Sequence, residues 1–162
     1  MNRLMIGPPV WVRVFTMIVL GAAMSFIAAS FTQAQRRATE DDSSVSHDYR
    51  GIQLGMLAEE VRKKLGDPKD KSDEQDFYIF GETETAQIVY DKTHKVITIS
   101  ADFLTSGTSV PTSKQIFGAD VEAKADGSVY KMVRFPKAGY WLSYNRTSGN
   151  SPLTTVTLQK IQ

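Results

Sequence analysis

Acidic residues are the side chains of this sequence that could carry catalysis. They occur in pairs and short clusters, namely Glu59/Glu60, Asp67/Asp70, Asp73/Glu74/Asp76 and Glu82/Glu84. Two carboxyl groups that converge on a cleft could act as the general acid and base of a glycosidase-like reaction. Each of these groups, however, falls on a helix exterior, in a polar loop or at a strand end, where a carboxylate keeps the surface solvated. We therefore expect no catalytic residue and a protein that is not an enzyme.

Histidine and cysteine narrow the chemistry further. His47 lies in a polar segment and His94 in a predicted hairpin turn, a spacing that offers no local pair of metal ligands. A serine nucleophile would need one of them as its base, and the sequence has no Gly-x-Ser-x-Gly motif. The chain has no cysteine, which excludes disulfides, thiolate metal sites and a lipid-bearing N-terminal cysteine. We expect no metal site and no cofactor.

Aromatic residues on predicted strands are the candidates for binding. Trp and Tyr on an uncovered sheet face can form the energetic centre of a protein interface. Neighbouring strand residues point to opposite faces, so Tyr140 and Trp141 cannot both point into the core. The alternative for each single aromatic residue is packing inside the core. The residues predicted to bind a partner are Tyr140, Trp141, Tyr144, Phe77 and Tyr78.

In the first half of the folded part, apolar residues four apart predict a helix over residues 58–65. Leu57, Val61 and Leu65 share one face of this helix, and Gly66 followed by Pro68 ends it. The polar run over residues 69–76 is typical of a loop. Aromatic and β-branched residues then predict strands over residues 76–80, 86–90 and 95–100.

The second half repeats this order of elements. Gly107 and Gly118 follow Gly55 and Gly66 at the same offset of 52 residues. Ser109 can cap a short helix over residues 110–117, in which Pro111 is tolerated in the first turn. Strands are predicted over residues 129–135, 139–144 and 154–161. The strand over 129–135 has no clean polar face, which is typical of a strand partly covered on both sides.

The two halves together predict an α+β fold. We expect two tandem helix-β-β-β repeats, residues 49–104 and 105–162, which form one six-stranded antiparallel sheet with the helices packed on one face. We expect an N-terminal hydrophobic leader or anchor helix before this fold. We also expect residues 35–48 to form a flexible tether, because they are almost free of apolar side chains.

The N-terminal segment, residues 1–34, predicts export from the cytoplasm. Residues 14–31 carry no charge, and Arg3 and Arg13 precede them. A basic start, an apolar middle and the small residues of Thr32-Gln33-Ala34 are typical of a cleaved signal peptide. Eighteen uncharged residues are also enough to span a bilayer as a retained anchor of the inner membrane. Both interpretations place the remainder of the chain outside the cytoplasm, in the periplasm or secreted.

Net charge gives no indication of nucleic-acid binding. The whole chain carries a formal charge of +1, and the charge becomes −1 once the two arginines of residues 1–34 are removed. A nucleic-acid-binding domain normally shows a clear excess of Lys and Arg. We therefore expect no nucleic acid among the partners, and contact with the membrane only through the N-terminal segment.

The first half resembles a known family over residues 51–103. Gly55-Met56, Val61 and Leu65-Gly66-x-Pro68, followed by aromatic strands, resemble the SmpA/OmlA family. The resemblance implies a small envelope protein of the kind that serves as an accessory in the assembly of outer-membrane β-barrels. The family's domain is similar in layout to the β-lactamase-inhibitor proteins, so the resemblance also implies a tandem layout for residues 49–162. The sequence departs from the family at Leu57, where Thr or Ser is usual, and in lacking the lipoprotein cysteine.

These observations predict a non-enzymatic, exported protein-binding module of the cell envelope. It would serve in outer-membrane assembly or maintenance, or act as an inhibitor-like binder, and its partner would be another envelope or secreted protein. The alternatives are a periplasmic protein that binds a small ligand, a carboxylate-using enzyme with a cleft between the repeats, and a structural envelope component held by its own anchor.

Overall fold

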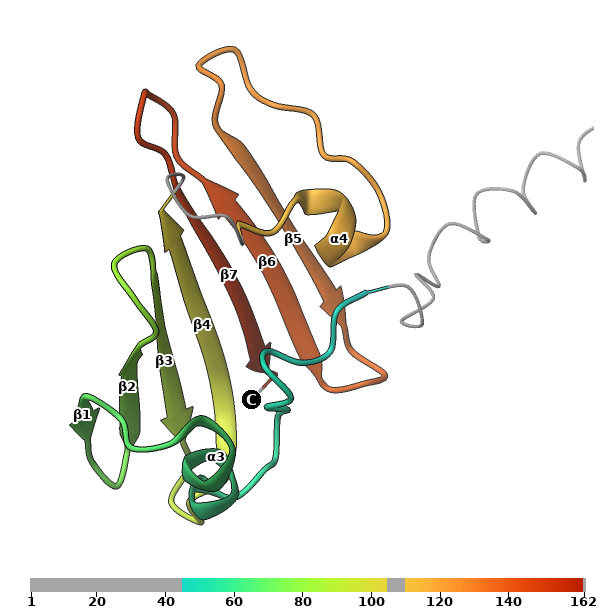
Figure 1. The fold of residues 1–162 in the computed structure, drawn as a ribbon. Helices are drawn as coiled ribbons and strands as arrows, with labels where there is room; N and C mark the ends of the chain where they lie inside the picture. Colours follow the sequence, from blue (N-terminus) through green and yellow to red (C-terminus); the bar gives the residue numbers. More distant parts are fainter. Residues whose placement is uncertain (1–44, 105–109, 162) are drawn as a thin grey trace, which may run out of the picture. The chain divides into compact units, whose positions relative to one another are not determined.

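One antiparallel sheet of seven strands is the framework of the protein (Figure 1). The computed structural model describes residues 45–104 and 110–161, so the predicted leader, residues 1–34, and residues 35–44 of the predicted tether lie outside the described residues. Neither helix in the described part of the chain has the length and apolar character needed to cross a membrane.

The strands follow the order β1-β2-β3-β4-β7-β6-β5 across the sheet, and every neighbouring pair is antiparallel. Two meanders, β1 to β4 and β5 to β7, meet where β4 pairs with β7. The strands are β1 (Asp70–Lys71), β2 (Gln75–Ile79), β3 (Glu84–Tyr90), β4 (Val96–Leu104), β5 (Val129–Phe135), β6 (Tyr140–Arg146) and β7 (Leu153–Lys160).

Helix α3 (Ala58–Leu65) lies over the end of the first meander. Leu57 has no hydroxyl to cap the helix, so the carboxylate of Glu60 accepts a hydrogen bond of 3.0 Å from the Leu57 N–H instead. Two acids stand in the first turn and three bases in the last, which suits the helix dipole. Gly66, with φ of +85°, ends the helix and donates from its N–H to the Arg62 carbonyl at 2.9 Å.

Helix α4 (Ser113–Phe117) is a short second helix, and its N-terminus differs from the predicted one. Thr112 is the capping residue rather than Ser109, and the Thr112 hydroxyl accepts from the Gln115 N–H at 3.2 Å. Pro111 precedes the helix instead of entering its first turn. Gly118 ends the helix in the left-handed conformation, with φ of +71°.

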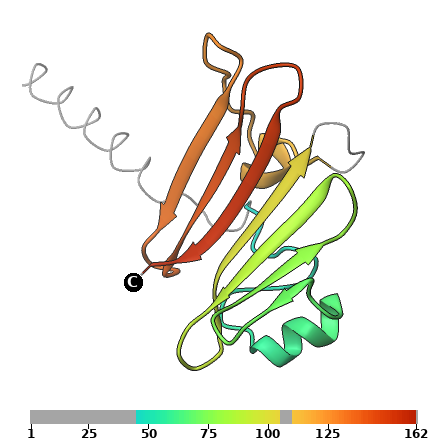
Figure 2. The same cartoon turned by 90° about the vertical axis from the view of Figure 1, so that its left-hand side faces the viewer.

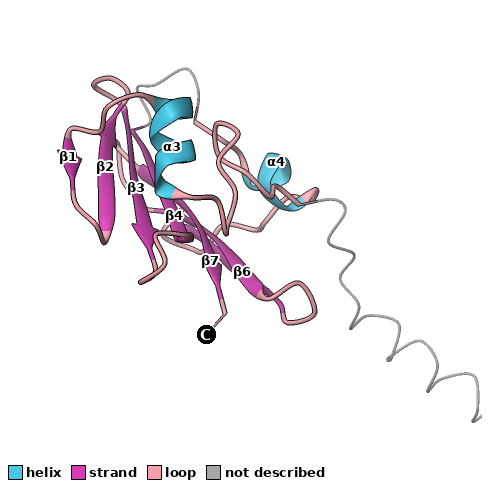
Figure 3. Ribbon diagram, turned by 90° about the horizontal axis from the view of Figure 1, so that it is seen from below, coloured by secondary structure: helices cyan, strands magenta, loops and turns pink. Residues whose placement is uncertain are grey.

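The core lies between the sheet and the two helices, which are on the same side of the sheet (Figures 2 and 3). Val61 of α3 and Ile116 and Phe117 of α4 are buried there. They belong to one apolar cluster with the sheet residues Tyr78, Ile88, Ile99, Leu142, Tyr144 and Leu158. Residues of a strand point alternately to the two faces of the sheet, so the intervening residues lie on the face that neither α3 nor α4 covers, which we call the open face.

The prediction of two tandem helix-β-β-β repeats is wrong. The first half contains an additional strand, β1, in the run predicted as a loop, because a tight turn at Ser72 folds this run back so that Lys69 N–H donates to the Phe77 carbonyl at 2.8 Å. The second half begins with the five-residue α4, continues through residues 118–128 without a strand, and then forms β5 to β7. The seven strands form one continuous sheet. The matching glycines Gly66 and Gly118 both end helices, a position that favours glycine in any helix and indicates no copied unit.

Residues 45–48, the end of the predicted tether, contact the domain. The Ser46 N–H donates to the Ile116 carbonyl at 3.1 Å, and His47 Nδ1 lies 3.1 Å from the Tyr140 hydroxyl. Val45 packs against the apolar core. The folded part of the chain therefore includes these residues.

Candidate functional site

The five residues predicted to bind a partner divide between the two faces of the sheet. Tyr78, Tyr140 and Tyr144 are only 2–6 % exposed and point into the core under the helices. Phe77 and Trp141, their immediate neighbours, are partly exposed and lie on the open face. The structure therefore leaves Phe77 and Trp141 accessible from that side and places the three tyrosines where they stabilise the fold.

The open face carries most of the large hydrophobic side chains that are exposed in the described residues. Five large hydrophobic side chains are exposed in the described part of the chain. Four of them project from strands on the open face with 42–51 % of their area exposed, namely Ile79, Leu104, Tyr130 and Met132. The fifth, Leu57, precedes α3. Single exposed hydrophobic residues are normal, whereas a concentration on one face marks an interaction surface.

Four of the open-face residues form a continuous group at one side of the sheet, which we call the β5–β6 patch: Tyr130, Met132, Arg134 and Trp141. Arg134 is the direct cross-strand partner of Trp141, and the three β5 residues alternate with core residues along the strand. Trp, Tyr, Met and Arg are the residue types enriched in protein interfaces. The patch thus has the composition of an interface centre.

The middle of the open face is polar. Ser100 and Thr157 are opposite each other on β4 and β7, with their hydroxyl oxygens 3.1 Å apart. In the next cross-strand pair on this face, the Thr155 hydroxyl donates to the Asp102 carboxylate at 2.6 Å. These bonds satisfy the polar side chains within the face, which then presents a polar centre flanked by apolar groups at the β2 and β5 sides.

Two acidic residues of the clusters, Asp76 and Glu84, are each held by an arginine. Asp76 is completely buried, and Arg62 of α3 donates to both of its carboxylate oxygens, at 2.8 and 2.9 Å. The Tyr90 hydroxyl donates to the same carboxylate at 2.7 Å. Burial, followed by the charge of Asp76, raises the pKa of Tyr78 from 10.0 to about 12, and burial with the Asp76 hydrogen bond raises the pKa of Tyr90 as well. The Asp76 carboxylate is therefore saturated by donors and serves to fasten α3 to the sheet.

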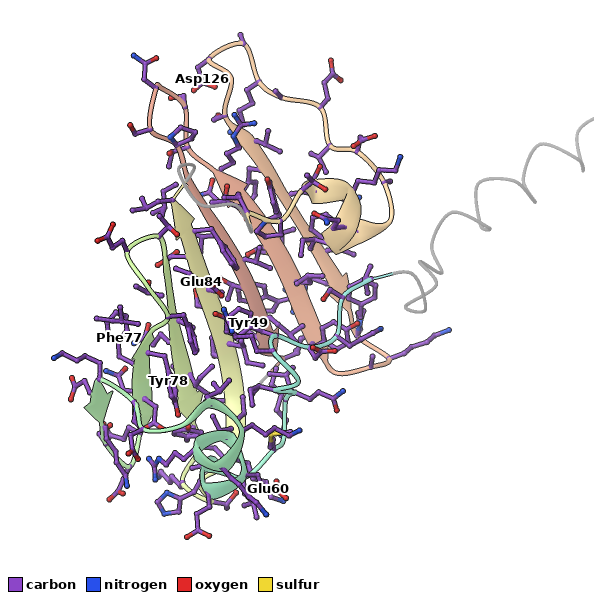
Figure 4. All side chains as sticks on the ribbon, viewed as in Figure 1. Tyr49, Glu60, Phe77, Tyr78, Glu84 and Asp126 are labelled. Atoms are coloured by element: carbon purple, nitrogen blue, oxygen red, sulfur yellow. The ribbon has the colours of Figure 1, made fainter. Side chains whose placement is uncertain are left out.

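Glu84 is the centre of a second such cluster (Figure 4). Arg50 donates to both Glu84 carboxylate oxygens, at 2.9 and 2.8 Å, and the Tyr49 hydroxyl donates to one of them at 2.7 Å. The Arg50 guanidinium also lies 4.2 Å from the centre of the Phe80 ring. The hydrogen bonds from Arg50 hold the pKa of Glu84 below its ordinary value. This cluster ties residues 49–50 to β3.

Asp76 and Glu84 do not share a cleft, whereas Glu59 and Asp73 line a pocket of about 310 Å³ together with Arg62 and His94. Asp76 and Glu84 are each engaged by their own arginine, and Glu60 caps α3. No group of three or more His, Asp or Glu side chains among residues 45–104 and 110–161 is placed to hold a metal ion.

A small apolar cavity lies on the helix side of the sheet. Its volume is about 120 Å³, and it is lined by residues of β4, β6 and β7 and by Ile116 of α4. Ala101 contributes a small side chain to the lining, and Ser46 and Asp48 also line the cavity. The apolar lining includes Ile99, Phe103, Pro111, Leu142, Val156 and Leu158.

Comparison with known proteins gives no relative: no family model, curated protein or solved structure matches the chain.

Sequence analysis missed three members of the β5–β6 patch, Tyr130, Met132 and Arg134. The sequence contains an alternation along β5 that indicates one exposed face. Val129, Val133 and Phe135 are purely apolar, and Tyr130, Met132 and Arg134 between them are amphipathic or charged. Lys131 hides this alternation in the sequence, because it is a charged residue on the otherwise apolar helix side. Its ammonium lies 4.9 Å from the centre of the Phe117 ring. In the described residues the strand is therefore covered on one face only, and the prediction of partial cover on both faces is wrong.

Proposed function

We propose that this chain is an exported protein-binding module of the cell envelope, and that its partner docks on the open face. The observation that carries the proposal is the gathering of exposed apolar residues on that face: four of the five in the described residues, Ile79, Leu104, Tyr130 and Met132, project from it. Exposing such side chains costs free energy that a docked partner recovers.

The kind of partner follows from the composition of the face. The β5–β6 patch combines Trp, Tyr, Met and Arg, and polar residues with internally satisfied hydrogen bonds lie beside it. Protein interfaces commonly have this arrangement of an aromatic centre and a polar surround. Another envelope or secreted protein fits it.

The envelope location rests on the sequence. The uncharged stretch over residues 14–31 supports export, and the resemblance of residues 51–103 to SmpA/OmlA proteins supports an accessory role in outer-membrane assembly or maintenance. Membrane contact would be made through the N-terminal segment alone. The inhibitor-like role depended on the tandem layout and is not part of the proposal.

The test is affinity capture from envelope extracts with the tagged full-length chain and its Trp141→Ser and Phe77→Ser variants. Both residues lie on the open face, so both variants should remain folded and should lose the partner. Loss of an interface hot spot costs about 2 kcal/mol, which lowers affinity about thirtyfold. Leu57→Ser is the control, because Leu57 is a large exposed hydrophobic residue (44 %) that lies before α3 and not on the open face. Equal capture by all four proteins would refute docking on the open face.

A second candidate function is the binding of a small apolar ligand, and the cavity over Ala101 favours it. Cavities of comparable size lined by Leu, Ile and Phe bind benzene-sized molecules. Ala101→Leu would fill the space, so a thermal shift produced by a short-chain alcohol or fatty acid in the unmodified chain should disappear in the variant. The absence of a shift with any such ligand would remove this candidate.

A further inference from the structure

The two edge strands of the sheet differ in length and charge, and therefore in their capacity to pair with a strand of another chain. One edge is β1, which has two residues, Asp70 and Lys71, both charged and exposed. The other edge is β5, which has seven residues and pairs with β6 in a continuous register without a bulge (Figure 1). A long regular edge strand is a template for pairing with another strand, whereas short and charged edges prevent it.

Three residues of β5 direct their backbone groups away from the sheet. The Gly139 carbonyl accepts from the Ile161 N–H at 2.7 Å, and at the other end of β6 the Thr147 N–H donates to the Leu153 carbonyl at 2.9 Å, so the odd-numbered positions along β6 bond with the β7 side. Because these directions alternate along a strand, Tyr140 faces β5 and bonds with its partner Phe135. Every second residue of β5 from Phe135 is thus bonded to β6. The residues whose N–H and C=O groups point outward are Tyr130, Met132 and Arg134, and the described residues provide no partner for them.

We propose that β5 pairs antiparallel with β5 of a second copy of this chain, about a two-fold axis at Met132. Met132 then lies opposite Met132 of the second copy, and Tyr130 lies opposite Arg134 of the second copy. Each of these pairs exchanges two backbone hydrogen bonds. The two seven-stranded sheets become one, and the two copies contribute the same surface, as a two-fold interface requires.

Side-chain complementarity selects both the occupant and the register. On the open face, pairing about Met132 places each Arg134 guanidinium beside a Tyr130 ring, an attractive cation–π arrangement, and joins two thioether side chains. On the helix side it places Lys131 opposite Val133, so no like charges meet. This register also pairs all seven residues of β5.

Any other two-fold axis leaves residues at one end of β5 unpaired, because Met132 is the centre of the strand, and some axes also oppose like charges. An axis at Arg134 would oppose two guanidinium groups, and an axis at Lys131 would oppose two ammonium groups, both destabilising. An axis at Tyr130 would carry the pairing beyond Val129, where the strand begins and the chain comes out of a turn at Gly127, with φ of +82°.

The inference does not depend on the proposed function, because two copies can pair whether or not another protein docks. The dimer would, however, bring two β5–β6 patches side by side on a common open face. A failure of the capture experiment and a failure of the dimer can therefore be told apart.

Site-specific disulfide formation tests the register in the full-length chain, which has no cysteine of its own. In a hydrogen-bonded antiparallel pair the Cα atoms are about 5.5 Å apart, and disulfides join Cα atoms about 4.4–6.8 Å apart. Met132→Cys should therefore give a covalent dimer under mild oxidation. Tyr130→Cys and Arg134→Cys should each stay monomeric when oxidised alone, because equivalent residues are about 13 Å apart. A mixture of these two variants should give a covalent dimer.

A second variant, Met132→Lys, places two ammonium groups opposite each other at an exposed position. It should keep the circular dichroism of the unmodified chain and weaken dimerisation by about tenfold or more in analytical ultracentrifugation. Cross-linking that is equal in all three single-cysteine variants would overturn the register. An unmodified chain that sediments as a monomer up to high micromolar concentration would overturn the dimer. The edge strand β5 would then be open to pairing with an extended segment of another protein instead.

Discussion

Arg62 of α3 and Asp76 of β2 form a two-pronged ion pair, with Nε 2.8 Å from Oδ2 and Nη2 2.9 Å from Oδ1. Asp76 is fully buried, and Arg62 remains partly exposed. A buried carboxylate is tolerated only when donors surround it, and here the Tyr90 hydroxyl supplies a third short bond. The pair therefore determines how α3 sits on the first meander.

Arg62→Met should destabilise the fold by about 3 kcal/mol, because it leaves a buried carboxylate without its counterion. Urea unfolding at neutral pH measures the loss. Lys63→Met is the matched control on the same helix, since Lys63 is exposed, and it should change stability by less than about 0.5 kcal/mol.

Combining Arg62→Met with Asp76→Asn removes the buried charge and keeps an acceptor for the Tyr90 hydroxyl. The double variant should be more stable than Arg62→Met alone. Similar losses of unfolding free energy in the Arg62 and Lys63 variants would contradict this, because the ion pair would then stabilise the fold no more than an exposed lysine does.

Acid should weaken the attachment of residues 49–50 to β3. Arg50 lowers the pKa of Glu84 in the folded state, so the unfolded state takes up the proton first as the pH falls. The contribution of Glu84 is complete above the ordinary value of 4.5 and is lost as the pH falls through the lower folded pKa. Glu84→Gln should lose about 1 kcal/mol at neutral pH and show a shallower fall in stability below pH 4.5 than the unmodified chain. Parallel pH profiles of the two proteins would contradict this role.

Alkali should weaken the fold through the buried tyrosines. Burial raises the pKa of Tyr78 to about 12, and it raises the pKa of Tyr49 and Tyr90 too. The unfolded state therefore loses these protons first, and stability that is complete below pH 10 is lost as the pH rises toward 12. Tyrosinate absorbance should show these three residues ionising only together with unfolding. Their ionisation in a chain that still has native circular dichroism would contradict the packing.

Adjacent residues of β6 should differ sharply in their effect on stability. Leu142 is fully buried under the helices, and Leu142→Ala should cost about 3 kcal/mol. Ser143 lies on the open face opposite Met132, and Ser143→Ala should change stability by less than about 0.5 kcal/mol. Thermal unfolding of the two variants measures this. Comparable losses would mean that the open face is covered by something other than solvent.

Local signals in the sequence were sufficient for several elements. The helix over Ala58–Leu65 is present as predicted, because Gly66 and Pro68 end it through backbone geometry alone. Six of the strands lie within a few residues of their predicted positions, since their apolar and β-branched runs are bounded by turn residues. The disposition of Tyr140 and Trp141 on opposite faces followed from strand alternation.

Features that depend on distant residues could not be predicted. β1 forms because Ser72 turns the polar run back onto β2, and its own residues have no strand pattern. The Arg62–Asp76 pair joins a helix and a strand, and sequence periodicity does not show which residues of two different elements lie close together. Tyr144 was assigned to binding although it is buried, because the face covered by helices is set by the packing of α3 and α4 and not by the strand itself.

Docking of another protein on the open face is the central claim, and site-specific photo-crosslinking in living cells tests it most directly. A photoreactive phenylalanine at Tyr130, on the open face, is compared with the same residue at Leu57, which is exposed to a similar degree before α3. The account predicts a discrete adduct with a second envelope or secreted protein from position 130 and none from position 57. Adducts from position 57 and none from position 130 would contradict it.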